Sequence, residues 1–226
     1  MVSAQAPAKN ELVWRPGEYW CRSDVAEGYD AGRFDSLKGR FYRWREEQAI
    51  EEALGVLPAE SSVLDAACGT GRITALLLRN RLAASGCDIS LAMMNVARRR
   101  LLSLGYRVPL IESSVDRLPF PDRSFDAVTC VGLMMHLDAE ARVRALRELA
   151  RVARGPLVVQ YGYVDACQRL MTRATGRPPG LSRFPVSASE LNADLESSGL
   201  IEEERFWPLR GLSSSLIVRL RKADAE

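Results

Sequence analysis

Residues 63–74 read Val63-Leu64-Asp65-Ala66-Ala67-Cys68-Gly69-Thr70-Gly71-Arg72-Ile73-Thr74. The start of this stretch is apolar and suits a buried strand, whereas Gly69-Thr70-Gly71 requires a sharp turn with bare backbone. From residue 72 to residue 82, apolar side chains recur at helical spacing. A strand, a glycine turn and a helix in this order open the ligand crevice of an α/β domain, and the helix N-terminus favours an anionic group there.

A second expected strand, residues 83–87, follows this helix and ends in Asp88, which lies 23 residues after Asp65. In α/β nucleotide-binding domains, an acidic residue at the end of the second strand holds a pair of ribose hydroxyls. Two ligands fit this pattern, a dinucleotide and an adenosyl sulfonium compound. In a second interpretation, Asp88 only caps the next helix, for which Ser90 is also a good N-cap.

The rest of the chain alternates between expected strands and helices. Strands are predicted at residues 108–111, 125–131 and 156–161, and helices at 91–104 and 138–153. Beyond residue 185, a helix over 188–198 precedes two further strands, at 200–207 and 212–220. This alternation predicts an α/β fold in which helices wind around a parallel sheet.

The chain divides into a leader, a cap and a core. Pro7, Pro16 and Gly17 interrupt any helix in residues 1–18, which predicts a flexible leader. Residues 19–57 form an aromatic-rich helical cap, including a helix over 37–57, and residues 58–226 form the core. Within the core, residues 162–185 are longer than an ordinary crossover and rich in arginine, so they are a candidate lid.

Composition excludes several classes of protein. The net charge of +2 and the pI of about 8.3 are too mild to indicate a nucleic-acid-binding protein. The five cysteines lack metal-ligand spacing, which indicates a reduced, cytoplasmic protein. No apolar run approaches the length of a membrane span. A single histidine, His136, excludes a histidine metal cluster, so we expect no metal.

Four ordered motifs resemble one known family. Val63-Leu64-Asp65-x-x-Cys68-Gly69-Thr70-Gly71 is similar to motif I of the class I S-adenosylmethionine-dependent methyltransferases, and Asp88-Ile89-Ser90-x-x-Met93 resembles their second-strand motif. Residues 117–128 resemble the loop and strand beneath the adenine, and residues 147–152 resemble the helix before strand five. The resemblance implies a doubly wound, mostly parallel seven-stranded sheet of the Rossmann-like methyltransferase fold, with an antiparallel C-terminal strand. It also implies S-adenosyl-L-methionine as cofactor and S-adenosyl-L-homocysteine as product.

The resemblance places the methionine part of the cofactor at the glycine turn. Gly69 and Gly71 would approach it, and Asp65 would help to bind its amino group. Val131 would lie near the methyl group that is transferred. Ala67 stands where the family usually has another glycine.

The adenosine part is assigned in the same way. Asp88 would hold the ribose hydroxyls, and Ile89 and Met93 would lie on either side of the adenine. Ser114 and Val115 occupy the positions that read the adenine edge, but Ser114 stands where an aspartate is common. Whether the Ser114 hydroxyl or a backbone group reads the adenine is left open.

Aromatic residues of the cap are further candidates for the pocket. Aromatic faces suit a cationic sulfonium, so we expect at least one of Trp20, Tyr29 and Tyr42 to reach the cofactor or the substrate. We assign Tyr29 to the cofactor site. The other aromatic residues are expected to pack against the sheet.

Methyl transfer from a sulfonium is an in-line displacement that requires alignment above all. A base is needed only where the nucleophile must lose a proton, and His136, just after the fourth expected strand, is the candidate. Alternatively, His136 is a structural residue before a helix. The sequence predicts methyl transfer to an O, N or C atom of a small molecule.

Three other functions were weighed. The arginines in 162–185 make RNA methylation one alternative. Ala67 and Ser114 depart from the family pattern, which leaves open a non-catalytic cofactor-binding protein. An NAD(P)-dependent oxidoreductase is disfavoured, because Thr74 stands where its third glycine would be. The acceptor and the oligomeric state cannot be read from the sequence.

Overall fold

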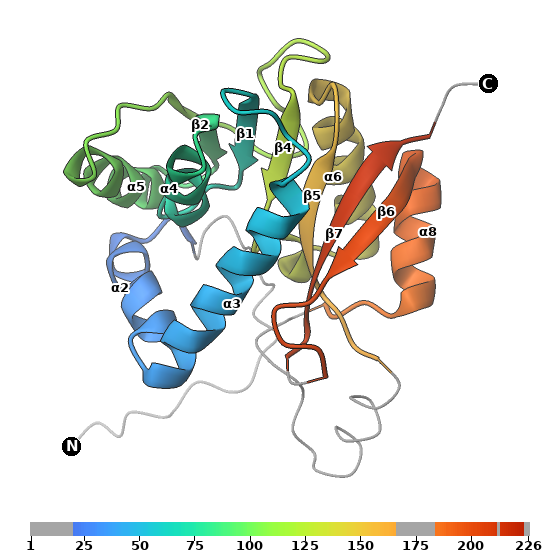
Figure 1. Cartoon of the computed structure of the whole chain (residues 1–226), viewed down its shortest axis with the longest axis horizontal. Helices are drawn as coiled ribbons and strands as arrows, with labels where there is room; N and C mark the ends of the chain where they lie inside the picture. The colour runs from blue at the N-terminus through green and yellow to red at the C-terminus, as the bar shows by residue number, and fades with distance from the viewer. Residues whose placement is uncertain (1–19, 166–183, 212, 224–226) are drawn as a thin grey trace, which may run out of the picture.

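The computed structural model describes residues 20–165, 184–211 and 213–223. The predicted leader and most of the candidate lid lie outside these residues. Seven strands form one sheet in the order β3-β2-β1-β4-β5-β7-β6 (Figure 1). The strands are β1 (Ser62–Ala66), β2 (Ala83–Asp88), β3 (Leu110–Glu112), β4 (Ala127–Cys130), β5 (Leu157–Gly162), β6 (Leu200–Phe206) and β7 (Ser215–Lys222).

Strand directions confirm the predicted fold. The pairs β1–β2, β1–β4, β2–β3 and β4–β5 are parallel. Strand β7 runs antiparallel to both of its neighbours, β5 and β6. The sheet is therefore seven-stranded and mostly parallel, with one antiparallel strand at the C-terminal end of the chain.

Helices cover both faces of the sheet. The helices are α2 (Ser23–Phe34), α3 (Leu37–Leu54), α4 (Arg72–Arg79), α5 (Leu91–Ser103), α6 (Ala139–Val152) and α8 (Ala188–Ser198), with a 3₁₀ turn, η1, at Met134–His136. Buried residues of α3 and α4 pack on one face, and those of α6 and α8 pack on the other.

Alternation along the strands builds these two cores. In β1, Val63 packs with α3 and α4, whereas the next residue, Leu64, packs with α6. In β4, Ala127 likewise packs on the side of α3 and α4, and Val128 packs on the side of α6. Because both faces are covered, the central strands are buried almost throughout and are mostly apolar, as expected of a parallel sheet.

Several element ends differ from the predictions. Helix α4 ends at Arg79 rather than residue 82, because the Asn80 side chain donates to the Leu76 carbonyl and Arg81 takes a positive φ of 60°. Helix α3 ends at Leu54, three residues before the predicted end. The cap contains a separate helix, α2, before α3. Helix α2 also packs against α5, which brings the cap to the carboxyl ends of β1 and β2.

Candidate active site

The glycine turn after β1 has an unusual backbone. Ala67, Gly69 and Gly71 all have positive φ, at 58°, 53° and 74°. A Cβ on Gly71 would lie 2.9 Å from the Cβ of Ala97, so Gly71 permits the close packing of the turn on α5. A Cβ on Gly69 would meet nothing within 4 Å. The backbone at Gly69 therefore borders open space at the sheet edge.

Asp88 joins this turn to the start of α5. Its carboxylate accepts hydrogen bonds from the backbone N–H of Gly69 and from that of Ser90, both at 2.8 Å. Burial raises the pKa of Asp88, although these N–H groups oppose the rise. Both interpretations of Asp88 are thus compatible, since the same carboxylate holds the helix start and borders the pocket.

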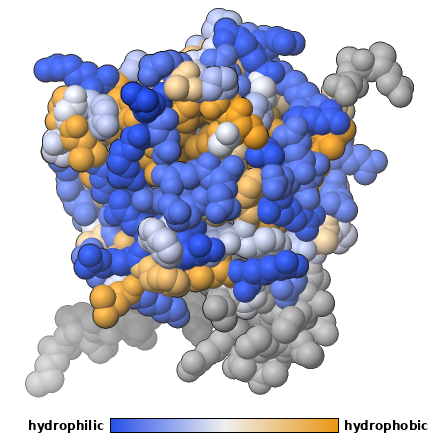
Figure 2. All heavy atoms as spheres, viewed as in Figure 1, coloured by the Kyte–Doolittle hydropathy of each residue, from blue (hydrophilic) through white to orange (hydrophobic). Residues whose placement is uncertain are grey.

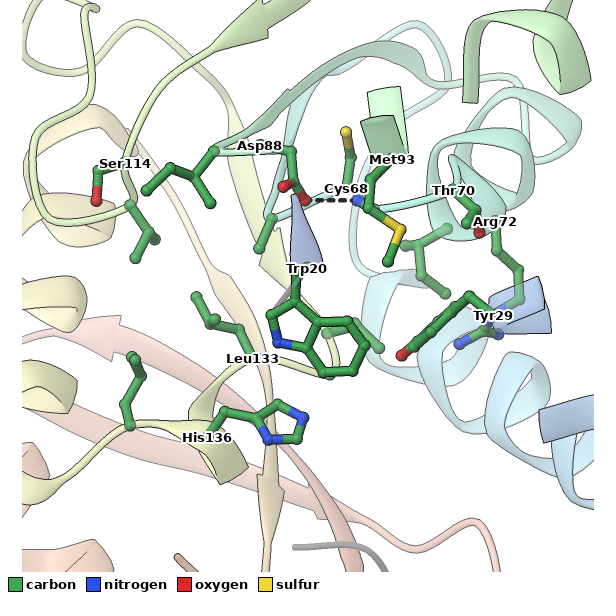
Figure 3. A pocket seen from close by; sticks show the side chains of 18 of the residues that line it. Trp20, Tyr29, Cys68, Thr70, Arg72, Asp88, Met93, Ser114, Leu133 and His136 are labelled. Carbon is green, nitrogen blue, oxygen red and sulfur yellow. Dashed lines mark hydrogen bonds between the residues drawn. The ribbon is translucent and has the colours of Figure 1, made fainter. Parts of the chain in front are cut away.

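A cavity of about 260 Å³ lies at the carboxyl ends of β1, β2 and β4 (Figure 3). The structure brings most of the predicted site residues to its wall: Tyr29, Ala67, Gly69, Asp88, Ile89, Met93, Ser114, Val115, Val131 and His136. Their individual roles stay predictions. Parallel strands bring these residues together because their carboxyl ends meet at one edge.

Two predicted residues, Asp65 and Gly71, do not line the cavity. The Asp65 carboxylate is buried and accepts hydrogen bonds from the Thr74 hydroxyl at 2.6 Å and the Thr129 hydroxyl at 3.1 Å. Burial raises the pKa of Asp65 to about 6, although both hydroxyls oppose the rise. In this arrangement Asp65 of β1 joins α4, through Thr74, to β4, through Thr129. Its predicted contact with the cofactor's amino group stays a prediction.

Aromatic residues form one end of the cavity. The Trp20 ring lies between Tyr29 and His136, with ring centroids 5.5 Å and 5.6 Å away. The Ser90 hydroxyl donates to the Trp20 carbonyl at 2.7 Å, which fastens this residue to the start of α5. His136 ends the 3₁₀ turn η1 and faces the ring of Trp20 (Figure 3).

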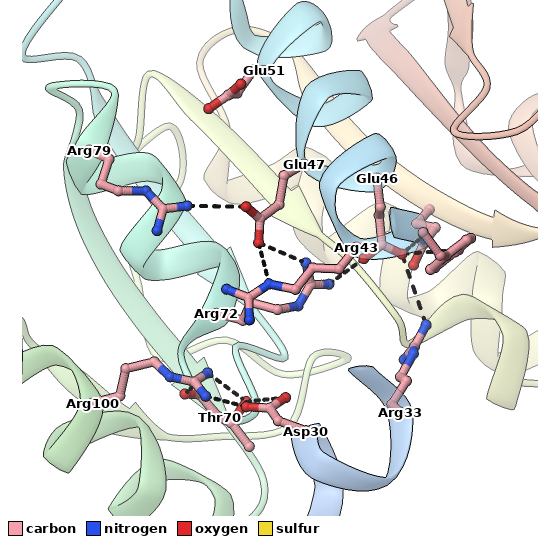
Figure 4. Close-up of polar contacts among 12 residues, drawn as sticks. Asp30, Arg33, Arg43, Glu46, Glu47, Glu51, Thr70, Arg72, Arg79 and Arg100 are labelled. Atoms are coloured by element: carbon pink, nitrogen blue, oxygen red, sulfur yellow. Dashed lines mark hydrogen bonds and ion pairs between the residues drawn. The ribbon is translucent and has the colours of Figure 1, made fainter. Parts of the chain in front are cut away.

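The sequence analysis missed two arginines, Arg33 and Arg72, that line the cavity. Both are held by Glu46, which is fully buried in α3 (Figure 4). Arg72 donates to the Glu46 carboxylate at 2.5 Å, and an Arg33 nitrogen lies 3.9 Å from it. Burial favours a higher pKa for Glu46, but Arg72 and Arg33 outweigh it and lower the pKa.

Further bonds complete the Glu46 cluster. Gln160 of β5 donates to the carboxylate at 2.6 Å, and the Tyr42 hydroxyl donates at 3.1 Å. Arg33 also donates to the Tyr29 hydroxyl at 2.8 Å. The only local signals in the sequence are the four-residue spacings of Tyr42 and Glu46 and of Tyr29 and Arg33, because the other partners are far apart in the chain.

Two serines follow β3 at the opposite end of the cavity. The Ser114 hydroxyl donates to Asp116 at 2.5 Å. The Ser113 hydroxyl is buried in the cavity wall without a hydrogen-bond partner among the described residues. Sequence reasoning selected Ser114 and missed Ser113. A ligand with a polar edge would satisfy the Ser113 hydroxyl.

Neither metal-binding clusters nor membrane-spanning helices occur in the described ranges. Within them, no cluster of three or more histidine, cysteine or acidic side chains is arranged to hold a metal ion. No helix in the same ranges combines the length and apolar character needed to cross a bilayer.

Known proteins similar to this chain fit this architecture. Residues 63–155 match a family described as "Methyltransferase domain". A demethylmenaquinone methyltransferase from Corynebacterium kroppenstedtii is 39% identical over 191 residues, which are 81% of this chain and 76% of that protein. One from Thermus thermophilus is 38% identical over 58% of each chain. For the Thermus protein and several other curated relatives, the match spans only about half of the relative's length.

A solved structure shows the same fold. Magnesium protoporphyrin IX methyltransferase from Synechocystis, crystallised with bound S-adenosylmethionine, superposes with a TM-score of 0.70. The match covers 95% of this chain and 100% of that one, at 16% identity. Together with the Corynebacterium relative, the sheet order and the glycine turn, this defines the class: the chain belongs to the class I S-adenosylmethionine-dependent methyltransferases.

Proposed function

We propose that this protein transfers the methyl group of S-adenosyl-L-methionine to a small planar aromatic acceptor that carries a hydroxyl group. One observation carries the proposal. A single cavity joins the glycine turn and Asp88 to an end lined by Trp20, Tyr29 and His136. The first part suits an adenosyl compound and the second suits a flat, apolar acceptor.

The residues present fit the adenosyl group. A carboxylate offers about four lone-pair positions, so Asp88 can accept from two ribose hydroxyls while it keeps its bonds to Gly69 and Ser90. Ile89 is 48% exposed and Met93 is buried, and an adenine ring between them would cover Ile89. The unpartnered hydroxyl of Ser113 is available to the adenine edge.

When bound, the sulfonium supplies an electrophilic methyl group. The protein then has to exclude water and align the acceptor in line with the sulfur–methyl bond. Val131, Leu133 and Leu137 make the acceptor end of the cavity apolar. Trp20 would offer an aromatic face for stacking, and His136, whose ring centroid is 5.6 Å from that of Trp20, would accept the proton of an acceptor hydroxyl as the new bond forms.

The relatives favour an aromatic acceptor. They are named as demethylmenaquinone methyltransferases and as a ubiquinone/menaquinone biosynthesis C-methyltransferase. Such names favour a small molecule over RNA and favour an enzyme over a non-catalytic binder. We therefore infer a hydroquinone-like ring as the acceptor. Four cysteines in the described ranges are free thiols, which supports a reducing compartment such as the cytoplasm.

Cofactor binding is tested by calorimetric titration of S-adenosyl-L-homocysteine. Asp88→Ala should raise the dissociation constant by roughly 30-fold or more, because two hydrogen bonds to a charged acceptor are lost. The matched control is Asp122→Ala, whose side chain is 74% exposed and far from the cavity wall. Wild-type protein that fails to bind the ligand would contradict the proposal.

The chemical step is tested separately with labelled cofactor and a panel of hydroxylated naphthalenes and benzenes, with total RNA as the competing acceptor. His136→Gln should lower turnover by about 10²–10⁴-fold. The same substitution should leave S-adenosyl-L-homocysteine affinity within about threefold, because it adds no charge to the cofactor site. Equal turnover in His136→Gln would assign the histidine a structural role.

A further inference from the structure

The N-terminal half of α3 has an unusual composition. Residues 37–45 contain four basic residues and no acidic one. Three large apolar side chains in the same half are exposed: Leu37 at 84%, Phe41 at 51% and Trp44 at 53%. Their spacing of four and three residues places them on one side of the helix. We call this set, with Lys38 and Arg40, the α3 basic–apolar face.

The second half of the same helix behaves differently. From Glu46 onward, α3 buries Ala49, Ile50, Ala53 and Leu54 against the sheet. The first half projects past the sheet edge, at the corner where α2 meets α3 (Figure 1). Figure 2 shows hydrophobic atoms along the lower edge of the molecule, where α3 begins. The three exposed side chains therefore lie outside both buried core clusters.

The charges around this face leave a positive surplus. Lys38 and Arg40 form no ion pair within the part of the chain that the structure describes. The neighbouring acidic residues are engaged elsewhere, since Asp30 pairs with Arg100, and Glu47 pairs with Arg43 and with two further arginines. Asp35 is the remaining acidic group at this corner. Two cations that form no ion pair with the described residues, beside an apolar strip, match an anionic, partly apolar surface.

We propose that the α3 basic–apolar face docks the protein on an anionic lipid membrane. Leucine, phenylalanine and tryptophan beside lysine and arginine are the composition of helices that lie in a membrane interface. An RNA partner explains the face less well, because Leu37, its most exposed member, offers no ring for a base to stack on.

The α3 basic–apolar face lies where docking would bring the cavity close to the membrane. Helix α2 carries Tyr29 and Arg33, which line the cavity, and it leads directly into the corner that starts α3. A protein held at this corner would keep the cavity within one helix length of the lipid surface. A lipid-dissolved acceptor would then be reached without crossing the water phase. The docking does not depend on the methyl-transfer chemistry.

The test uses the full chain and sedimentation with vesicles of phosphatidylcholine, with and without about 30 mol % phosphatidylglycerol. Wild-type protein should partition onto the anionic vesicles and only weakly onto the neutral ones. The double variant Leu37→Ser/Phe41→Ser should lower the partition coefficient at least tenfold on the anionic vesicles. Lys38→Glu/Arg40→Glu should lower it to the value for neutral vesicles.

The matched control is Leu102→Ser/Leu104→Ser, which removes two leucines of similar exposure, 48% and 50%, at the end of α5. It should leave partition unchanged. All variants should keep the wild-type affinity for S-adenosyl-L-homocysteine, so failure of docking is distinguishable from failure of the cofactor proposal. The proposal would be overturned by no partition of the wild-type protein, by equal loss in the control, or by RNA binding that outcompetes the vesicles. A dimer that forms in solution and is lost in Leu37→Ser/Phe41→Ser would also overturn it.

Discussion

At the scale of single residues, Ala67 has a backbone conformation that suits glycine better. Its φ of 58° lies in the left-handed region, which costs a residue with a Cβ about 1–2 kcal/mol. Ala67→Gly removes this cost and adds unfolded-chain entropy of about 0.4–1 kcal/mol. We expect urea denaturation to show a free energy of unfolding higher by about 0.5–1 kcal/mol. Ala66→Gly, in the buried strand, should lower it, and a loss of stability in both variants would contradict the argument.

Asp65 makes stability depend on pH in a way that one substitution isolates. Its pKa is raised by burial to about 6 in the folded protein, against roughly 3.9 in an unfolded chain. The folded state therefore favours the protonated carboxyl, and this contribution is full below about pH 4 and lost as the pH rises through about 6. The side chain of the Asp65→Asn variant does not ionise, so its stability has no such loss as the pH rises.

The stability of Asp65→Asn relative to wild type should thus rise by roughly 2 kcal/mol between pH 4 and pH 7, since each pKa unit corresponds to about 1.4 kcal/mol. Urea denaturation across this range measures the difference. The exposed control Asp122→Asn should show no such rise, and a pH-independent difference for Asp65→Asn would contradict the assigned pKa.

Several of the predicted site residues lie at strand ends. Asp88 ends β2, and Gly69 and Val131 follow β1 and β4; the carboxyl ends of these strands meet at the same sheet edge, so the proximity of the three residues follows from the fold. By contrast, Arg33 and Arg72 are held at the cavity by the carboxylate of Glu46, which lies on another helix, α3. Glu46 pairs with Arg72 across 26 residues and with Gln160 across 114, and no spacing rule predicts such pairs.

At the scale of elements, Glu46 fastens α3 to α4, α2 and β5. It is a fully buried carboxylate with two arginines and two neutral donors. Glu46→Gln would leave Arg72 buried beside a neutral amide. Breaking such a pair costs about 3–5 kcal/mol, because the remaining charge is uncompensated.

We therefore expect Glu46→Gln to lower the free energy of unfolding by about 3 kcal/mol and to weaken S-adenosyl-L-homocysteine binding, since Arg33 and Arg72 line the cavity. Chemical denaturation and titration calorimetry measure the two effects. Glu140→Gln, which breaks an exposed pair with Arg144 within α6, should change neither by much. Similar effects in both variants would show that burial of Glu46 is unimportant.

Element ends were less predictable than element order. Alternation of strands and helices correctly predicted the parallel part of the sheet. The early end of α4 depends on the Asn80 side chain and the positive φ of Arg81, neither of which interrupts an apolar pattern. The start of α3 at Leu37 was predicted, and Ser36 caps it by accepting from the Gly39 N–H, but the separate helix α2 before it was not.

At the scale of the whole molecule, the sheet and the cap differ in how far sequence determined them. The antiparallel direction of the C-terminal strand came from the resemblance to a family, because the periodicity of residues 212–220 gives a strand without a direction, and its position between β5 and β6 was not predicted. How the cap sits on the core is set by side-chain pairs between distant segments, such as the one that joins Asp30 to Arg100.

That pair provides a test of whether cap and core act as one unit. Asp30 of α2 accepts from the Thr70 hydroxyl of the glycine turn at 3.0 Å and pairs with Arg100 of α5. Arg100 also donates to the Thr70 carbonyl at 3.0 Å. Asp30→Ala removes the shared acceptor, so the partly buried guanidinium of Arg100 loses its ion pair, at a cost of about 1–2 kcal/mol.

If cap and core are coupled, this loss should favour opening of the cap by roughly 5–30-fold, seen as faster proteolysis within residues 20–57 under native conditions. S-adenosyl-L-homocysteine should slow this cleavage in wild-type protein, because its site is built from both parts. Glu27→Ala is the matched control: Glu27 pairs with Arg99 between the same two helices, but both side chains are 59% exposed. Such an exposed pair contributes little, so equal cleavage of the two variants would mean that Thr70 and Asp30 do not couple the cap to the glycine turn.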